Sequence, residues 1–300
     1  MTIYQNIDTN KWRSGILLLF FVVIVIALGF VFSYAFNSPV ILYFAIVIAL
    51  IQGLLSYFSG DKIALSISGA QKLNRKSNEP LFRIVENLTI TAGLPMPEIY
   101  IISDDAPNAF ATGRDPKHAS LAVTTGLLDI LDKNELEGVI AHELSHVGNY
   151  DTRLMMIVVV LVGVITLLSD LFLRSRWFGF GGRNRDSGGD GQLQAILLIV
   201  ALVAAILAPI AATLIQLAIS RKREFLADSS GALLTRYPEG LAGALKKIGG
   251  YSRPMRKVSG ATAHLYISDP FGKKESYFQK IFSTHPPISE RIAALNKMSV

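Results

Sequence analysis

The chain has 300 residues, 51% of them hydrophobic and 17% charged, and its mean hydropathy is +0.41. This composition argues against a soluble protein and indicates membrane spans, while the absence of cysteine excludes a disulfide framework and any Cys-ligated metal site. The net charge of +6 is explained better by basic residues flanking the spans than by nucleic-acid binding, because these residues are dispersed and are not gathered with aromatic side chains.

The first 58 residues predict a short polar tail followed by a transmembrane hairpin. Residues 14–36 carry no charge and are long enough to cross a hydrocarbon core of about 30 Å as a helix. A cleaved signal peptide is the alternative, but its apolar region would be shorter and no small-residue cleavage site clearly follows. Residues 40–58 form a second uncharged run after the turn Asn37-Ser38-Pro39. We therefore expect an uncleaved hairpin within residues 1–58.

Basic residues flank this hairpin at both of its ends. Lys11 and Arg13 precede the first run, and Lys62 and Lys72 follow the second. The positive-inside rule places these flanks in the cytoplasm. We expect a multi-pass protein of the cell inner (cytoplasmic) membrane whose soluble parts face the cytoplasm.

Residues 59–153 are expected to form the first part of a soluble domain. Helical spacing of apolar residues predicts a helix over 79–92, and β-branched runs predict strands at 98–102 and 120–125. A third extended segment is expected between the two strands, and its residues are Asn108, Ala109, Phe110, Ala111, Thr112 and Gly113. Such a strand can pair with the backbone of a bound polypeptide through its first four residues. A plain sheet strand under a helix is the alternative, and the sequence leaves both open.

A helix with two histidines follows these strands. Asn134 is a good N-cap, and Glu137 lies three residues later as in a capping box. His142 and His146 are four residues apart, so both imidazoles lie on one face and reach a single metal ion. Glu143 is offset by about 100° from His142, close enough to hold a water molecule on that metal. This is the HExxH arrangement of zinc peptidases; two buried histidines with ordinary hydrogen bonds are the alternative.

Two further apolar runs over residues 154–219 predict a second membrane hairpin. Residues 154–173 form the third run, and residues 193–219 form the fourth, in which Pro209 predicts a kink. The loop between them, residues 174–192, is rich in Gly and Arg. If both runs span, the arginines of this loop violate the positive-inside rule locally. Either the early spans already fix the orientation, or these two runs do not span and instead lie against the domain or enter the membrane only partly.

The third ligand of the predicted metal site must come from later in the chain, because a catalytic zinc usually has three protein ligands. The metzincin motif would supply the third ligand from His at position 152 after Gly at position 149. The chain has Asn149 and Thr152 there, so this class of zinc peptidase is excluded. Glu224 is the best candidate and begins the second part of the domain, residues 220–300. Asp228 lies one helical turn later, well placed to accept a hydrogen bond from a ligating imidazole. The alternative is an ordinary charged start of a juxtamembrane helix.

These motifs together resemble a known family. The four predicted runs, HELSH from His142 to His146, REFLAD from Arg223 to Asp228, Thr284-His285-Pro286-Pro287 and Arg291 resemble the HtpX family of membrane-embedded zinc proteases. That family belongs to the gluzincins and is related to the CaaX prenyl proteases. The likeness covers nearly the whole chain and includes residues 108–113, which are similar to the family's substrate-side segment.

The resemblance implies an α+β membrane protein with about four transmembrane helices. Its catalytic domain is expected to be mostly helical and zincin-like, with a small β-sheet. One Zn²⁺ ion per chain is implied, held by His142, His146 and Glu224, with Glu143 as the general base. Metal identity is inferred, since other divalent ions accept such ligands.

The implied activity is cleavage of misfolded or damaged membrane proteins, as in protein quality control, by a domain facing the cytoplasm. The expected partners are membrane protein or unfolded polypeptide substrates and the lipid bilayer, with no nucleic acid. A CaaX-type processing metalloprotease is the alternative among enzymes, although its relatives usually have more spans. A non-catalytic membrane metal-binding scaffold is the alternative outside enzymes, and the intact Glu143 argues against it.

Three further residues are candidates for the site. His285 is the first candidate for stabilising the oxyanion, with an inhibitory fourth ligand or a plain turn residue as alternatives. His264, with its neighbour Tyr266, comes next, whereas His118 is expected to be an ordinary loop residue. Arg291 is expected either to bind a substrate carbonyl or to form a salt bridge.

Overall fold

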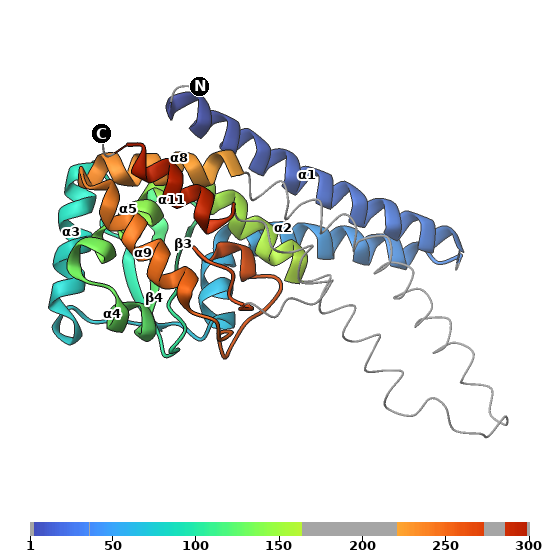
Figure 1. Ribbon diagram of the computed structural model, residues 1–300. Helices are drawn as coiled ribbons and strands as arrows, with labels where there is room; N and C mark the ends of the chain where they lie inside the picture. Colours follow the sequence, from blue (N-terminus) through green and yellow to red (C-terminus); the bar gives the residue numbers. More distant parts are fainter. Residues whose placement is uncertain (1–2, 36, 164–220, 273–285, 299–300) are drawn as a thin grey trace, which may run out of the picture.

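The computed structural model describes residues 3–35, 37–163, 221–272 and 286–298, which form a mostly helical domain and two long helices extending from it (Figure 1). The helices α1 (Ile3–Ala35) and α2 (Pro39–Ile67) lie side by side as a hairpin. Within them, Ile7–Ala27 and Pro39–Ile67 have mean hydropathies of 1.7 and 2.3 and are long and apolar enough to cross a membrane. The first predicted hairpin is thus present as two candidate membrane helices.

The second helix extends further than the sequence predicted. The hairpin was expected to end at residue 58 and the soluble domain to begin at residue 59, but α2 continues to Ile67. Its last turns carry Ala64 and Leu65, which are buried in an apolar cluster of the domain. Gly60 permits a close approach, because a Cβ at this position would lie 2.5 Å from Met156 Cγ. The helix therefore passes from the candidate membrane segment into the domain without a linker.

Only the start of the second predicted hairpin is described. Residues 151–163 are helical, and Leu154, Ile157 and Leu161 pack against Leu17 and Phe21 of α1. The remainder of the hairpin, including the Gly/Arg-rich loop, lies outside the described residues. Two candidate spans are therefore shown, and four spans stay a prediction.

Four strands form a mixed sheet in the order β1-β2-β4-β3. The parallel centre consists of β2 (Glu98–Ile102) and β4 (Ala119–Thr124), as the β-branched runs predicted to within one residue. The strand β1 (Gln71–Lys72) pairs antiparallel with β2, and β3 (Ala109–Gly113) pairs antiparallel with β4. The expected third extended segment is therefore the edge strand β3.

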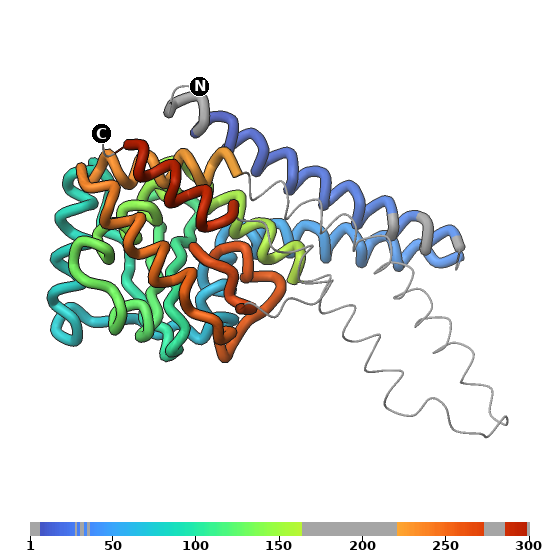
Figure 2. Tube along the Cα trace, in the orientation of Figure 1, coloured from blue at the N-terminus to red at the C-terminus, as the bar shows by residue number. Residues whose placement is uncertain are grey.

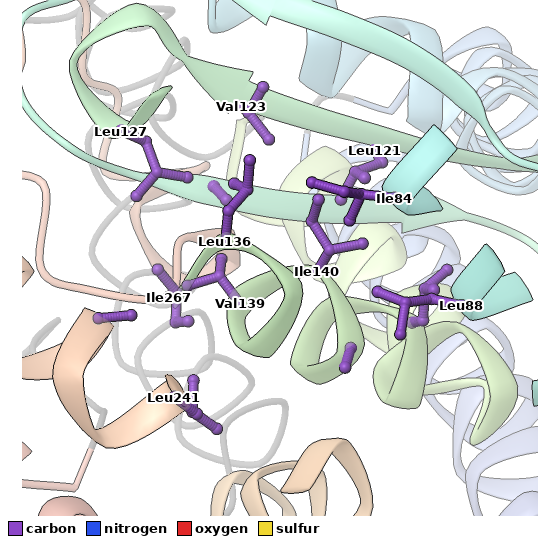
Figure 3. Packing of buried hydrophobic residues seen from close by; sticks show 14 of the residues in the cluster. Ile84, Leu88, Leu121, Val123, Leu127, Leu136, Val139, Ile140, Leu241 and Ile267 are labelled. Carbon is purple, nitrogen blue, oxygen red and sulfur yellow. The ribbon is translucent and has the colours of Figure 1, made fainter. Parts of the chain in front are cut away.

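Helices pack on this sheet around one apolar core (Figure 3). The predicted helix α3 (Glu79–Ala92) and the histidine-bearing helix α5 (Lys133–Gly148) pack against β2 and β4, and α9 (Pro238–Gly250) packs against α5. Figure 2 shows the segments after residue 221, orange to red, running beside the green segment that contains α5. These segments include α8 (Arg221–Thr235) and α11 (Ile288–Asn296). The remaining short elements are η1 (Arg75–Ser77), η2 (Pro116–His118), α4 (Thr125–Ile130) and η3 (Ala263–Leu265).

The start of α5 differs from the prediction by two residues. Its N-cap is Asp132, whose side chain accepts a hydrogen bond from Glu135 N over 3.0 Å, while Asp132 N donates to Glu135 Oε2 over 2.9 Å. The predicted cap at Asn134 is wrong because both pairs have capping-box spacing and the earlier pair forms. Lys247 of α9 holds Glu135 in place, with Nζ 2.6 Å from Oε2.

Candidate metal centre

The helix α5 presents His142 and His146 on one buried face, as their spacing predicted. His142 is 1% exposed and His146 is 5% exposed. Their Nε2 atoms are 3.3 Å apart, and the rings meet edge to face with centroids 4.8 Å apart. The same ring nitrogen of each histidine is therefore turned toward one point.

Glu224 of α8 is the third member of this cluster. Its Oε2 lies 3.8 Å from His142 Nε2, and its Oε1 lies 3.6 Å from His146 Nε2. Gly231 brings α8 this close to α5, because a Cβ at this position would lie 2.9 Å from His142 N. Among the described residues, these three side chains form a group whose ligand atoms all lie within 4.8 Å of one another and which could hold a metal ion.

Two buried carboxylates face the opposite nitrogens of the two imidazoles. Asp228 Oδ1 lies 2.9 Å from His142 Nδ1, where the sequence placed an acceptor, and Asp151 Oδ2 lies 3.0 Å from His146 Nδ1. A carboxylate partner fixes the proton on Nδ1 and leaves Nε2 as the metal-binding atom. The ring orientation of both histidines is thus set by carboxylates behind them.

The charges around the cluster favour a cation. Burial lowers the pKa of His146, but the hydrogen bond to Asp151 and the neighbouring carboxylates outweigh this effect and raise that pKa to about 9. Burial raises the pKa of Asp228, but its hydrogen bonds with His142 and Arg291 outweigh burial and hold the pKa below its usual range. Positive charge is therefore stabilised at the ring nitrogens.

The donor set fits zinc. A tetrahedral centre with Zn–N and Zn–O bonds of about 2.0–2.1 Å places its ligand atoms about 3.3–3.4 Å apart. The two Nε2 atoms are 3.3 Å apart, and the carboxylate oxygens of Glu224 are a few tenths of an ångström further away, at 3.6 and 3.8 Å. Two histidines with one glutamate are also a ligand set of catalytic zinc sites, in which the fourth position stays open.

Glu143 lies next to this group and contacts the sheet. Its residue is 2% exposed, and its Oε2 accepts a hydrogen bond from Ala111 N over 2.9 Å. Burial raises the pKa of the Glu143 carboxyl, and the two neighbouring histidines oppose that rise. A carboxylate that takes up a proton readily is therefore held between α5 and β3.

Arg291 of α11 closes the cluster from another side. Its Nη2 and Nε lie 2.6 and 2.8 Å from the two oxygens of Asp228, and its Nη1 lies 3.7 Å from Glu224 Oε2. The residue is fully buried, and Nη1 also donates to Ile267 O over 3.1 Å. Of the two expected roles of Arg291, the structure shows the salt bridge.

The expected substrate-side segment, residues 108–113, contains the edge strand β3. Some backbone groups on the outer edge of this strand already have hydrogen-bond partners within the protein. Ala109 O accepts a hydrogen bond from Ile267 N over 3.0 Å, and the Asn108 amide donates to Ser268 O over 3.0 Å. Phe110 is fully buried against Tyr266, with ring centroids 5.1 Å apart. The Ala111 N–H is the edge donor that faces Glu143.

The other histidines lie outside the cluster or outside the described residues. His264 is buried, and its Nε2 lies 3.1 Å from Met155 O. His118 is exposed at the end of the short helix η2, not in a loop as expected, and its Nδ1 lies 2.7 Å from Asp115 Oδ1. His285, the first candidate for oxyanion stabilisation, lies outside the described residues.

Sequence reasoning missed Asp151. This residue lies five positions after His146 and three positions before the third run begins at Leu154. Tyr150 adopts the left-handed conformation with φ 60°, and this turn after α5 brings Asp151 back onto His146. A carboxylate at the border of a predicted span was the only signal in the sequence.

Comparison with known proteins assigns the chain to a family. The model of peptidase family M48 matches residues 75–299. A protease HtpX homolog of Caldanaerobacter subterraneus subsp. tengcongensis is 46% identical over 100% of this chain and 99% of its own length. The protease HtpX homolog of Streptococcus gordonii is 45% identical over 99% of this chain and 100% of its own length. The crystal structure of S. mikatae Ste24p has a TM-score of 0.49 and 17% identity over 97% of this chain and 65% of that chain.

The matched region includes every residue of the His142–His146–Glu224 group, and the full-length relatives extend the match across both candidate membrane helices. The family is one of metallopeptidases with membrane-bound members, which agrees with a buried metal-binding group in a domain attached to apolar helices. The chain belongs to peptidase family M48 and, within it, to the HtpX homologues.

Proposed function

We propose that this protein is a zinc-dependent membrane endopeptidase in which His142, His146 and Glu224 hold the metal and Glu143 is the general base. The observation that carries the proposal is the position of the Glu143 carboxylate beside three buried ligand side chains. A ligand-only site has no use for a carboxylate at that position, since the three ligands are already supplied. When bound, zinc lowers the pKa of water to about 7 and polarises the scissile carbonyl.

Glu143 then acts on the attacking water and on the leaving group. Its carboxylate takes the proton of the water molecule as the water attacks the scissile carbonyl carbon. The same carboxylate later delivers this proton to the leaving amine. Burial excludes bulk water around the carboxylate, so the proton taken from the attacking water passes to the leaving amine and is not lost to solvent.

The edge strand β3 provides the contact for the substrate backbone. Ala111 N–H points out of the sheet toward Glu143, 2.9 Å away, so an extended peptide bound there lies beside the general base. Because Ala109 O is taken by Ile267 N and Gly113 O by the Thr152 hydroxyl, the substrate pairs with the part of β3 around Ala111. Asn108 and Phe110 support this strand from inside the domain. His285 stays the candidate oxyanion donor predicted from the sequence.

The proposed substrates are unfolded segments of membrane proteins. Two candidate membrane helices hold the domain at a bilayer, where segments of damaged membrane proteins emerge. The basic flanks of these helices favour the cytoplasmic side of the inner membrane. A role in protein quality control follows from this substrate class.

The test uses purified full-length protein in detergent and an unfolded membrane protein as the substrate. Glu143→Gln is expected to lower the cleavage rate by about 10²–10⁴-fold, as removal of a general base does, while one zinc ion per chain is retained. Glu137→Gln on the same helix is the matched control, because Glu137 faces Lys133, 3.7 Å away, and not the metal group. Undiminished cleavage by Glu143→Gln would contradict the proposal, as would metal binding that survives the loss of Glu224.

A further inference from the structure

A buried amide from the first membrane helix lies in contact with the residues around the metal group. Asn10 of α1 is 3% exposed. Its Nδ2 donates to Asn149 O over 2.9 Å and to Asp151 Oδ1 over 2.8 Å. Buried polar side chains are normally satisfied, and this one is satisfied by residues about 140 positions later in the chain. The candidate membrane helix is thus joined to the domain by specific hydrogen bonds.

Asp151 connects this amide to a histidine of the metal group. One oxygen, Oδ1, accepts from Asn10, while the other, Oδ2, lies 3.0 Å from His146 Nδ1. Arg223, the neighbour of Glu224, lies beside the same pair, with Nη1 3.6 Å from Asp151 Oδ1 and 3.4 Å from Asn10 Oδ1. Each oxygen of the carboxylate therefore has its own partner, and the plane of the carboxylate is fixed.

We propose that Asn10 is a positioning residue for the metal centre. Its amide orients Asp151, and Asp151 in turn orients the imidazole of His146 and holds the proton on Nδ1. Partners behind metal-ligating histidines set ring orientation and metal affinity even though they do not touch the metal. This inference rests on the proposed function, because it requires that His146 binds the metal.

The alternative is that Asn10 only attaches α1 to the domain. The two roles differ in how the effects of substitution combine. If Asn10 acts through Asp151, its substitution has no further effect once Asp151 has lost its carboxylate. If Asn10 only attaches the helix, the two effects are independent.

The experiment measures zinc affinity of the full-length protein in detergent by competition with a chromogenic chelator, together with the absorption spectrum of the Co²⁺-loaded protein. The variants are Asn10→Leu, which keeps the size and removes both donated hydrogen bonds, Asp151→Asn, and their combination. Ser14→Ala is the matched control, because Ser14 is equally buried one turn along α1 and donates to its own helix at Asn10 O over 2.8 Å. Circular dichroism and size-exclusion chromatography establish that each variant is folded.

We expect Asp151→Asn to weaken zinc binding by about 10–100-fold, the usual effect of losing such a partner. Asn10→Leu should weaken it in the same direction and change the Co²⁺ absorption bands, and the combined variant should bind as Asp151→Asn does. Ser14→Ala should bind as the wild type. If Asn10→Leu does not fold, Asn10→Asp is the second variant, which places a carboxylate oxygen in the position of the Nδ2 donor and should also weaken zinc binding.

Three outcomes would overturn this inference. In the first, both Asn10 variants bind zinc as the wild type does. In the second, the effects of Asn10→Leu and Asp151→Asn multiply in the combined variant, which shows independent roles. In the third, a further variant, His146→Ala, binds zinc as tightly as the wild type does; this result overturns the proposed function as well, whereas the first two leave it intact.

Discussion

The backbone N–H of Ala111 donates a hydrogen bond over 2.9 Å to the carboxylate of Glu143. The outer edge of the sheet and the helix with both histidines therefore meet at the proposed general base. In the proposed mechanism, a peptide that binds to this edge would take over the Ala111 N–H and release the Glu143 oxygen for the attacking water. Substrate binding and activation of the base would then be coupled by this one hydrogen bond.

Ala111→Pro tests this coupling. Proline removes the N–H, and because that group points away from β4, no bond of the sheet is lost. We expect kcat/KM for an unfolded substrate to fall about five- to tenfold, the value of one hydrogen bond, with zinc content unchanged. Ala111→Gly keeps the N–H and is the control. Equal activity of the two variants would show that the edge donor does not contact substrate.

Arg291→Met is expected to be strongly destabilising. The substitution leaves the buried carboxylate of Asp228 without its guanidinium, and breaking a buried pair costs about 3–5 kcal/mol. Arg83→Met is the control, because the side chains of the Arg83–Glu79 pair are 67% and 56% exposed and such pairs contribute at most about 1 kcal/mol. The measurement is thermal unfolding in detergent, where similar shifts for both variants would argue against the structural role of Arg291.

Gly231→Ala is expected to separate α8 from α5. The new methyl would lie 2.9 Å from His142 N, so the helix carrying Glu224 must shift. We expect a loss of about 1–3 kcal/mol in stability and weaker zinc binding, measured by unfolding and by chelator competition. Gly250→Ala, at a position where a Cβ meets nothing within 4 Å, should leave both unchanged. Full zinc affinity in Gly231→Ala would contradict the tight packing of the two helices.

Asp132→Ala tests the observed start of α5. Loss of this N-cap is expected to cost about 1 kcal/mol of stability. Asn134→Ala, at the position that the sequence suggested as the cap, should change stability by less than about 0.5 kcal/mol because the side chain is exposed. If Asn134→Ala lost more stability than Asp132→Ala, Asn134 would be the N-cap, as the sequence suggested.

The second predicted hairpin can be tested by labelling. The chain has no cysteine, so Gly188→Cys introduces a single thiol into the predicted loop between the third and fourth runs. If both runs span, a membrane-impermeant maleimide labels this thiol in intact cells. Asn134→Cys is the control and should be labelled only after permeabilisation. A cytoplasmic thiol at position 188 would contradict four spans and would leave the metal centre unaffected.

Local spacing was enough to predict part of the site. His142 and His146 share a helix face because they are four residues apart. Glu224 was proposed as the third ligand because the two histidines need one and this glutamate follows the fourth apolar run. The strands β2 and β4 and the helix α3 were predicted nearly to the residue, since β-branched runs and apolar periodicity are local properties.

The contacts made by tertiary packing were out of reach of the sequence. Asp151 reaches His146 only because Tyr150 turns the chain in the left-handed conformation. Asn10 reaches Asp151 only because α1 packs beside the helical residues 151–163. The start of α5 was misplaced because Asp132–Glu135 and Asn134–Glu137 have the same capping-box spacing. The first pair is supported by Lys247, which contacts Glu135 but lies 112 positions later in the chain.

The unbroken path of α2 from Pro39 to Ile67 determines how the domain sits at a bilayer. A flexible tether would let the domain tilt and drift, whereas a helix whose last turns are packed in the domain core has no hinge at the junction. At 1.5 Å of rise per residue, the nine residues from Ser59 to Ile67 span about 14 Å. If the lipid surface lies near Phe58, the candidate metal centre is held at a fixed height above it, and for the proposed activity this height would set how far a membrane-anchored polypeptide must protrude before it can be cut.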